Sequence, residues 1–556
     1  MQTGAEILIR ALENEHVELV FAYPGGASLE ILDCLRESPI RTVLVRHEQG
    51  AAHEASGYAR VSGKPGVCIA TSGPGATNLV TGIAAAAMDS VPMVAITGQV
   101  QAAMVGTDAF QEVDVTGITD PITKHNYLIK DADAVAKTVK EAFHIATSGR
   151  PGPVLIDLPR DIAMTLSGVT TAGAVDLRGY KPNLKGHTGQ IRQVLRLLAQ
   201  AIRPLIIAGG GVIGAGCWDE LLQLAERQQI PVASTLMGLG SIPPDHPLAL
   251  GMAGVHGLAP ANLAIQRADL IIGLGTRFSD RLTGNVEGFA PHAKVVHIDV
   301  DPAEIGKNMR VDVPLVGDLR IVLRQLLDEL GQAQHPAWLA EIDELRSIRA
   351  PGSRISEGLS PITVIEALAD VLPAQAIVTT DVGQHQLWAA QRLPHHRPRS
   401  FISSGGLGAM GYGIPAAIGA KLAAPDAPVI AITGDGSFQM GLPELGTAKE
   451  QNLPIKILLL NNASLGLVRQ LQDYYCDHRY AAADFTDNPD FGMLIKAYGG
   501  SYYPVHCEAD LAPALSGFMA DSGLTLLEAK VTCEENVLPM VLSGHTLDAM
   551  EGIDII

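Results

Sequence analysis

An aspartate and an asparagine each follow an apolar segment in the last third of the chain. Asp435 lies in residues 434–437 (GDGS), and Asn462 comes 27 residues after it, at the end of the next apolar run. Carboxylate and amide oxygens are ligands that suit Mg²⁺, which also favours phosphate oxygens. The flanking glycines would let a phosphate approach the backbone at a helix start. The pattern predicts a Mg²⁺–phosphate site; the alternative is two ordinary turns, because Asp-Gly and Asn-Asn are common turn dipeptides.

A second candidate is Glu48, which lies in residues 46–52 (RHEQGAA) after a short strand expected at 42–45. A carboxyl group at a strand end can exchange a proton with a bound molecule when the carboxyl group is buried. The alternative is a surface glutamate that caps a helix start at Gln49.

The middle third contains a glycine triplet and an aspartate at strand ends. Residues 209–211 (GGG) follow one apolar run, and Asp299 ends another. Such an aspartate is placed to accept a hydrogen bond from a ribose hydroxyl. Taken alone, the triplet is a weak indication of dinucleotide binding.

The segments that must position these residues are short and continuously apolar, which is typical of strands buried on both faces of a parallel sheet. We expect such strands at 19–22, 67–70, 93–97, 154–157, 205–208, 270–274, 295–299, 377–381, 429–433 and 455–461. Helical stripes lie between them, as at 191–202. This alternation predicts an α/β fold of doubly wound parallel sheets.

Two polar stretches with glycine and proline, 168–187 and 346–360, divide the strands into three blocks. We therefore expect three domains, at 1–170, 185–345 and 358–556, in line with about 100–200 residues per domain. The first and third blocks are similar in size, but the sequence does not show whether they share a fold.

Composition excludes several classes of protein. The net charge is −19, which disfavours binding to nucleic acids and anionic membranes. The six cysteines form no C-x-x-C pair, which favours a reducing compartment over a disulfide scaffold. Charged residues interrupt the first 20 positions, and no apolar run reaches about 18 residues. We expect a cytoplasmic protein without a signal peptide, a membrane span or a nucleic-acid partner.

Motifs in order along nearly the whole chain resemble the catalytic large subunit of acetohydroxyacid synthase, also called acetolactate synthase, a family of thiamine-diphosphate-dependent enzymes. The pair GDG and NN at 434–436 and 461–462 resembles the thiamine-diphosphate motif. The other matching segments are 21–27 (FAYPGGA), 46–52 (RHEQGAA), 71–78 (TSGPGATN), 106–112 (GTDAFQE), 123–126 (TKHN), 148–153 (SGRPGP), 381–386 (DVGQHQ), 406–411 (GLGAMG) and 536–540 (NVLPM).

The resemblance implies an architecture and a reaction. The three domains would bind the cofactor's pyrimidine, FAD, and the diphosphate with Mg²⁺, in that order, with a C-terminal tail on the third. The enzyme would decarboxylate pyruvate and join the two-carbon unit to a second 2-keto acid, giving 2-acetolactate or 2-aceto-2-hydroxybutyrate for branched-chain amino acid biosynthesis. FAD would be structural, because the net reaction involves no redox step.

The same resemblance implies a homodimer or homotetramer and a small regulatory subunit. Two alternatives stay open, namely a related carboligase such as glyoxylate carboligase, and a non-catalytic paralogue.

The resemblance also assigns residues. Glu48 would hydrogen-bond the pyrimidine N1′, and the remaining catalytic candidates are Gly26, Phe110, Gln111 and Lys124. Candidate contacts to thiamine diphosphate are Gln384, His385, Gly408, Met410, Gly436, Ser437 and Leu467. The metal ligands would be Asp435, Asn462 and the backbone carbonyl of Ser464, and the FAD contacts would be Arg150, Gly211, His256, Arg277, Arg281, Asp299 and Asp318. The alternatives are loop packing for Phe110 and Gln111, and an ordinary core position for Met410.

One position departs from the family pattern. Where that pattern has a tryptophan that lines the pocket for the second substrate, this chain has Leu471. The sequence therefore leaves open the preference between pyruvate and 2-ketobutyrate, and the neighbouring residues 466–470 also resemble glyoxylate carboligase.

Overall fold

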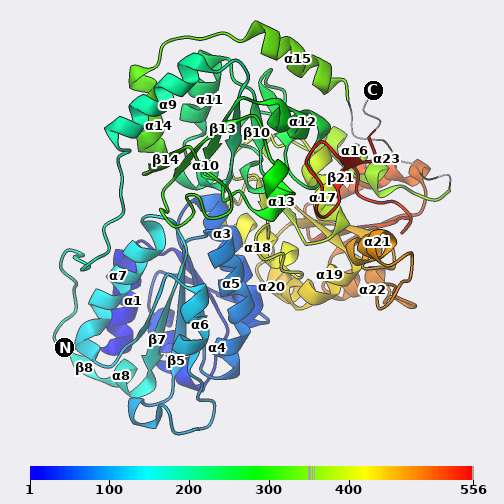
Figure 1. Cartoon of the computed structure of the whole chain (residues 1–556). Coiled ribbons are helices and arrows are strands. Elements are labelled where there is room, and N and C mark those ends of the chain that lie inside the picture. The colour runs from blue at the N-terminus through cyan, green and yellow to red at the C-terminus, as the bar shows by residue number, and fades with distance from the viewer. Residues whose placement is uncertain (349–351, 353–354, 356, 554–556) are drawn as a thin grey trace.

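The computed structural model describes residues 1–348, 352, 355 and 357–553. Three parallel six-stranded sheets follow one another along the chain, each with helices on both faces (Figure 1). This confirms the expected α/β class. The ten apolar runs all form strands of these sheets, because such runs can be buried only between two helical layers.

The N-terminal sheet is covered by α1 (Gly4–Asn14) and α7 (Val135–Thr147) on one face and by α3 (Glu48–Ser62) and α5 (Val80–Met88) on the other. Its strands run in the order β3 (Arg41–Leu44), β2 (Leu19–Ala22), β4 (Gly66–Ala70), β5 (Met93–Gln99), β7 (Pro153–Pro159) and β6 (His125–Leu128).

The C-terminal sheet has the same order when its strands are counted from its own start. They are β16 (Phe401–Ser403), β15 (Ile377–Thr380), β17 (Val429–Gly434), β18 (Ile455–Asn461), β20 (Thr525–Lys530) and β19 (Ser501–Val505). The covering helices are α16 (Pro361–Val371), α17 (Gln384–Arg392) and α23 (Glu508–Ala520) on one face, and α18 (Gly413–Ala423), α20 (Leu445–Glu450) and α22 (Phe491–Ala497) on the other. The first and third domains therefore share a topology, which the sequence did not show.

The middle sheet has a different order, β11 (Ala249–Met252), β10 (Val232–Ser234), β9 (Pro204–Ala208), β12 (Leu270–Leu274), β13 (Lys294–Asp299) and β14 (Val313–Val316). The strand order reverses between β9 and β12. Open α/β sheets bind ligands in the crevice at the carboxyl ends of the strands at such a point.

The end of the chain packs on the middle domain rather than on the domain that precedes it. Val541, Leu547 and Met550 are buried in the same apolar cluster as α12 (Ala259–Arg267) and α15 (Pro336–Arg346). The amide of Asn285 also donates to the carbonyl of His545 at 3.0 Å. The C-terminal tail expected on the third domain therefore reaches back to the middle domain, and the second expected linker at 346–360 lies partly outside the described residues.

The first and third domains pack closely through α3 and α18. A Cβ atom added to Gly57 would collide with the carbonyl of Ala416, and one added to Gly419 would collide with the carbonyl of Glu54. The two helices therefore pack with their backbones close together. Within the described part of the chain, no helix is both long enough and apolar enough to cross a membrane.

Candidate active site

Glu48 is the first residue of α3 and follows β3 at the carboxyl edge of the N-terminal sheet. Its side chain is buried, and the Asn78 Nδ2 donates to its Oε2 at 2.9 Å. The start of the helix is capped by His47, whose Nδ1 accepts from the Gln49 amide. Glu48 is therefore not an exposed capping residue, and its carboxyl group lies in a confined polar position.

Two further catalytic candidates, Gly26 and Gln111, lie in loops that contact the turn after β4. The amide of Ala27, next to Gly26, donates to the Thr71 hydroxyl at 3.2 Å. Gln111 has a φ of 58°, and a Cβ atom added to Gly73 in the turn would lie 2.8 Å from the carbonyl of Gln111. The side chain of Phe110 is 87% exposed. The loop that carries Phe110 and Gln111 is thus packed against the turn through its backbone, while the side chain of Phe110 points away from the protein.

Lys124 does not join this group. It directly precedes β6, so it lies at the amino edge of the sheet, opposite Glu48. Its ammonium group donates to the carbonyl groups of Ile145 and Ser148, at the end of α7, and to the hydroxyl of Tyr180. Burial lowers the pKa of Lys124 to about 8. In this chain Lys124 connects α7 to the segment that leads into the middle domain.

The metal candidates lie at the carboxyl edge of the C-terminal sheet. The register pairs Gly434 with Leu460, so Asp435 and the loop after Asn461 leave neighbouring strands side by side. Asp435 is 1% exposed, and burial raises its pKa to about 6 although Asn488 donates to it at 2.7 Å. A bound cation would offset that cost of burying the carboxylate.

Asn462 and Ser464 form the adjacent turn. The Asn462 Oδ1 accepts from the Ser464 amide at 3.1 Å, and the Ser464 hydroxyl donates to the carbonyl of Ala483. The backbone carbonyl of Ser464 receives no hydrogen bond from any described residue. The arrangement therefore offers a carboxylate, an amide and a free carbonyl oxygen, a set that suits a hard divalent cation.

Three helices begin around these oxygens without side-chain caps, namely α17, α19 (Asp435–Gly441) and α21 (Gly466–Tyr475). Uncapped helix starts leave amide groups free to bind an anion. The Gln384 Oε1 and the His385 Nε2 are buried and lack a partner in the described structure. A Cβ atom added to Gly466 would collide with Gln384 and lie 2.7 Å from Asn462, so these groups converge. Burial lowers the pKa of His385 to about 3, which keeps it neutral.

The remaining candidates of this domain lie around the same edge. Gly408 has a φ of 69° and is exposed, and Met410 is half-buried two residues later. Gly436 lies against Leu465, and the Ser437 hydroxyl donates to the carbonyl of Val382 at 3.3 Å. Leu467 and Leu471 lie in the first turns of α21; Leu471 is 42% exposed.

The middle domain brings its glycines together at the point where its strand order reverses. Gly211 follows β9, and a Cβ atom added to it would lie 2.6 Å from the Cα of Gly275, which follows β12. Asp299 ends β13, and burial raises its pKa to about 6. The His256 Nδ1 is buried and lacks a partner among the described residues. This is the crevice in which such a sheet holds a nucleotide.

The other FAD candidates border this crevice in different ways. Arg150 comes from the first domain and pairs with Glu304 at 2.6 Å. Asp318 caps α14 (Leu319–Glu329) by accepting from the amide of Ile321. Arg277 is half-buried, and Arg281 is largely exposed, with Asp280 3.8 Å away.

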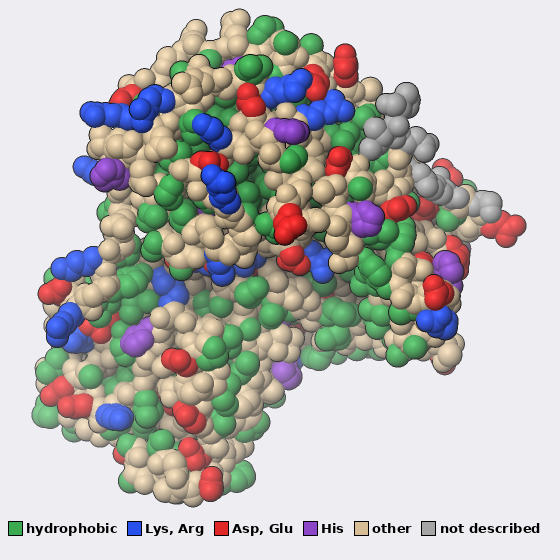
Figure 2. Space-filling model, viewed as in Figure 1, with side chains coloured by type: hydrophobic (Ala, Val, Ile, Leu, Met, Phe, Trp, Pro, Cys, Tyr) green, Lys and Arg blue, Asp and Glu red, His purple; other side chains and the backbone are tan. Residues whose placement is uncertain are grey.

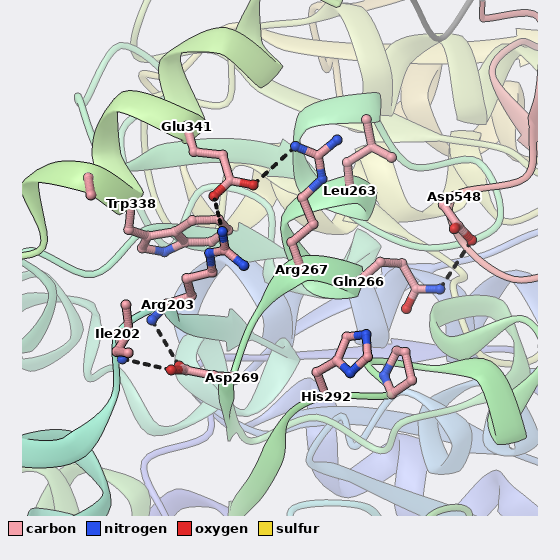
Figure 3. Close-up of a pocket in the computed structure, with 12 residues that line it drawn as sticks. Ile202, Arg203, Leu263, Gln266, Arg267, Asp269, His292, Trp338, Glu341 and Asp548 are labelled. Atoms are coloured by element: carbon pink, nitrogen blue, oxygen red, sulfur yellow. Dashed lines mark hydrogen bonds and ion pairs between the residues drawn. The ribbon is translucent and has the colours of Figure 1, made fainter.

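A cavity of about 810 Å³ lies elsewhere, at the amino edge of the middle sheet (Figure 3). Arg203 and Arg267 both pair with Glu341 there, each at 3.1 Å, and Asp548 reaches in from the chain's tail. Both guanidinium groups point toward this one carboxylate (Figure 3). None of the candidate site residues lines this cavity.

Family models match all three domains. The models described as N-terminal TPP binding domain, central domain and C-terminal TPP binding domain of thiamine pyrophosphate enzymes match residues 2–118, 191–326 and 381–529. An acetolactate synthase of Mycobacterium leprae is 48% identical over 99% of this chain and 90% of its own length. The chain belongs to the acetolactate synthase family of thiamine pyrophosphate enzymes.

Two further members of this family come from distant organisms. A probable acetolactate synthase large subunit of Methanocaldococcus jannaschii is 47% identical over 98% of this chain and 94% of its own length. The chloroplastic acetolactate synthase 3 of Brassica napus is 47% identical over 98% of this chain and 86% of its own length.

Several polar residues of the site were missed from the sequence. Asn78 holds Glu48, Asn488 holds Asp435, and Glu444 accepts from the amides of Arg46 and His47 just before Glu48. Each of these contacts joins residues at least 30 positions apart, so no local pattern marks them. Of these three residues, only Asn78 lies within a motif quoted from the sequence, the segment 71–78 (TSGPGATN).

Proposed function

We propose that the protein condenses pyruvate with a second 2-keto acid to give 2-acetolactate or 2-aceto-2-hydroxybutyrate, with thiamine diphosphate, Mg²⁺ and FAD as its cofactors. The observation that carries this proposal is the pairing of two complementary strand edges. One edge holds a buried carboxyl group at Glu48, and the other holds Asp435 among three uncapped helix starts.

The C-terminal edge fits the diphosphate and its metal. Asp435, Asn462 and the Ser464 carbonyl would hold Mg²⁺, and the His385 Nε2, which lacks a partner among the described residues, would donate a hydrogen bond to the diphosphate. The Gln384 Nε2 already donates to Gln470 and to the carbonyl of Glu535, so the Gln384 Oε1, an acceptor, would face a donor such as a water bound to Mg²⁺. Bound thiamine diphosphate supplies the electron sink for decarboxylation. The chain's own contribution at this edge is to bind and orient the ligand through its helix starts and buried polar groups.

The N-terminal edge fits the pyrimidine ring. Glu48 would share a proton between its carboxyl group and the ring nitrogen N1′, with Asn78 fixing the carboxyl group's orientation. Gly408 and Met410 would contact the ring from the C-terminal domain. Gln111, Phe110 and Gly26 would line the entry to the substrate.

We infer that Glu48 and Asp435 act together across two copies of the chain. In the described part of the chain no hydrogen bond connects Glu48 or Gln111 with Asp435 or Asn462. Apolar side chains gather on the surface over α5 and α19 (Figure 2), where Met88 is 40% and Met440 56% exposed. Such a contiguous apolar area favours burial by a second copy, which would bring the edges together. We therefore propose a homodimer or larger homo-oligomer, with a small regulatory subunit as a further partner.

The middle crevice fits FAD. Glycines 209, 211 and 275 let the loops after β9 and β12 pack with their backbones in contact, and Asp299 and His256 offer buried polar atoms at the crevice beside them. FAD would stabilise the middle domain without taking part in net redox chemistry.

The purified protein should be yellow and should convert pyruvate to acetolactate, detected as acetoin after acid treatment. Its flavin should stay oxidised during turnover. A colourless protein that is fully active without added FAD would contradict the flavin proposal, and absence of acetoin would contradict the reaction.

A further inference from the structure

The loop between β16 and α18, residues 404–412, carries Gly408 and Met410, the proposed contacts to the pyrimidine ring. Glycines occupy four of its positions, 405, 406, 408 and 411. A segment this rich in glycine has little conformational preference of its own. Its position must therefore be set by contacts from outside the loop.

The first half of this loop is held by a carboxylate from the N-terminal domain. Asp89 follows α5, and its side chain is 3% exposed. Its Oδ1 accepts from the Gly406 amide at 2.7 Å, and its Oδ2 accepts from the Gly405 amide at 3.2 Å. A Cβ atom added to Gly406 would lie 2.8 Å from the Asp89 Oδ1, so glycine is required for this approach.

An arginine from the helix of Glu48 completes the anchor. The Arg60 Nη2 lies 3.3 Å from the Asp89 Oδ2. Its Nη1 donates to the carbonyl of Ser403, directly before the loop, and to the hydroxyl of Tyr412 at 3.1 Å, at the loop's end. One buried guanidinium group therefore contacts both ends of the loop and pairs with the carboxylate that holds the loop's first half.

The second half of the loop is held within its own domain. Asp381 accepts from the amides of Gly411 and Gly413 at 2.8 and 2.9 Å. The two carboxylates use the same kind of contact, but only Asp89 belongs to another domain.

We propose that Arg60 and Asp89 are positioning residues through which the N-terminal domain sets the loop that contacts the cofactor's pyrimidine ring. This inference rests on the proposed function of Gly408 and Met410. A carboxylate with two amide donors and a guanidinium partner is a strong anchor when buried. Removing its charge leaves Arg60 buried without a partner ion.

The test compares two ligands that share the diphosphate site. In the purified FAD-containing protein, we expect Asp89→Asn to weaken binding of thiamine diphosphate by about 10- to 100-fold. Binding of Mg²⁺ with inorganic diphosphate, measured by calorimetry, should change by less than about twofold, because that ligand does not reach the loop. Gly406→Ala, which displaces the loop and leaves the ion pair in place, should reproduce the selective loss if Asp89→Asn does not fold.

The matched control is Glu450→Gln. Glu450 pairs with Arg46 and also joins the first and third domains, but its side chain is 45% exposed and does not touch the loop. This control should leave both affinities unchanged. Equal losses for the two ligands, or equal losses in Asp89→Asn and Glu450→Gln, would overturn the proposal, because the ion pair would then act only on the docking of the domains.

Met410→Ala separates this inference from the function on which it rests. If Met410→Ala weakens thiamine diphosphate binding and Asp89→Asn does not, the positioning role is wrong and the loop contact stands. If Met410→Ala leaves binding unchanged, the loop contact itself is wrong, and the inference falls with it.

Discussion

The N-terminal and C-terminal sheets have one strand order and use it for two kinds of chemistry. In both, the candidate residues follow the first four strands of the domain at the carboxyl edge. In the N-terminal domain these strands lead to Gly26, to Glu48, to the 71–78 turn and to Gln111. In the C-terminal domain they lead to Gln384, to Met410, to Asp435 and to Asn462.

The difference lies in the groups that each edge offers to a ligand. In the N-terminal domain His47 caps α3, whereas α2 (Leu29–Arg36) and α4 (Pro74–Asn78) begin without side-chain caps, so what sets this edge apart is the buried carboxyl group of Glu48. In the C-terminal domain α17, α19 and α21 have no side-chain caps, so its edge attracts anions. One fold therefore supplies an edge suited to acid–base chemistry in one domain and an edge suited to an anion and a metal in the other. The loops at each edge determine which of the two chemistries it supports.

The strongest test of this contrast removes the acid from the N-terminal edge. We expect Glu48→Gln to lower turnover by roughly 10²–10⁴-fold, the usual worth of a positioned acid–base group. The flavin should be retained, and exchange of the C2 proton of bound thiamine diphosphate, followed by NMR, should slow. Glu30→Gln, on α2 (Leu29–Arg36), is the control and should keep full activity. Unchanged proton exchange in Glu48→Gln would show that Glu48 is not the acid–base group.

Removing the carboxylate from the C-terminal edge should act on binding instead. We expect Asp435→Ala to weaken thiamine diphosphate at least tenfold, because a hard cation loses its one charged protein ligand. Flavin content should not change, since the flavin lies in another domain. Asp426→Ala, at the exposed amino edge of the same sheet, should have no effect. Cofactor affinity that depends on neither Mg²⁺ nor Asp435 would show that the metal site is wrong.

Substitution of Leu471 tests whether the C-terminal edge lines the pocket for the second substrate. A well-fitted wall against one methyl group is worth about tenfold to 200-fold in selectivity. We expect the native protein to prefer 2-ketobutyrate only weakly over pyruvate, and Leu471→Trp to raise that preference within this range. Competition between the two keto acids measures it. Val468→Trp, on the same helix and equally exposed, is the control. A native enzyme that already favours 2-ketobutyrate strongly, with no gain from Trp, would show that Leu471 does not set specificity.

The smallest effect on activity should come from replacing Asp157, which lies within β7 of the N-terminal sheet. It is buried, and its carboxylate accepts from Thr97 and Gln99. Burial raises its pKa to about 7, above an unfolded value near 4. Because the folded state favours the protonated form, its contribution to stability is complete below about pH 4 and is lost as the pH rises to about 7.

Asp157→Asn removes this dependence. We expect its melting temperature relative to the native protein to rise between pH 5 and pH 8, corresponding to about 2–3 kcal/mol of stability. The exposed Asp33→Asn should show no such trend. A constant difference between Asp157→Asn and the native protein across this range would mean that Asp157 is ionised throughout.

Much of the fold could be predicted because its central strands are continuously apolar, and ten of them were. Most edge strands, such as β19 (Ser501–Val505) with sequence SYYPV, were not identified, because a strand paired on one side need not be uniformly apolar; the edge strand β3, expected at 42–45, is an exception. The strand orders could not be predicted either, because order depends on pairing between distant segments. For the same reason Glu48 and Asp435 were found from local motifs, whereas Asp89 and Glu444 were not.

The tail that fills the core of the middle domain imposes an order on synthesis. Val541, Leu547 and Met550 emerge from the ribosome after every strand of the C-terminal sheet, yet they cover α12 of the domain before it. The middle domain therefore stays incomplete, with an apolar face open to chaperones, until almost the whole polypeptide has been translated. A chain that ends before Val541 would leave this face of the middle domain uncovered.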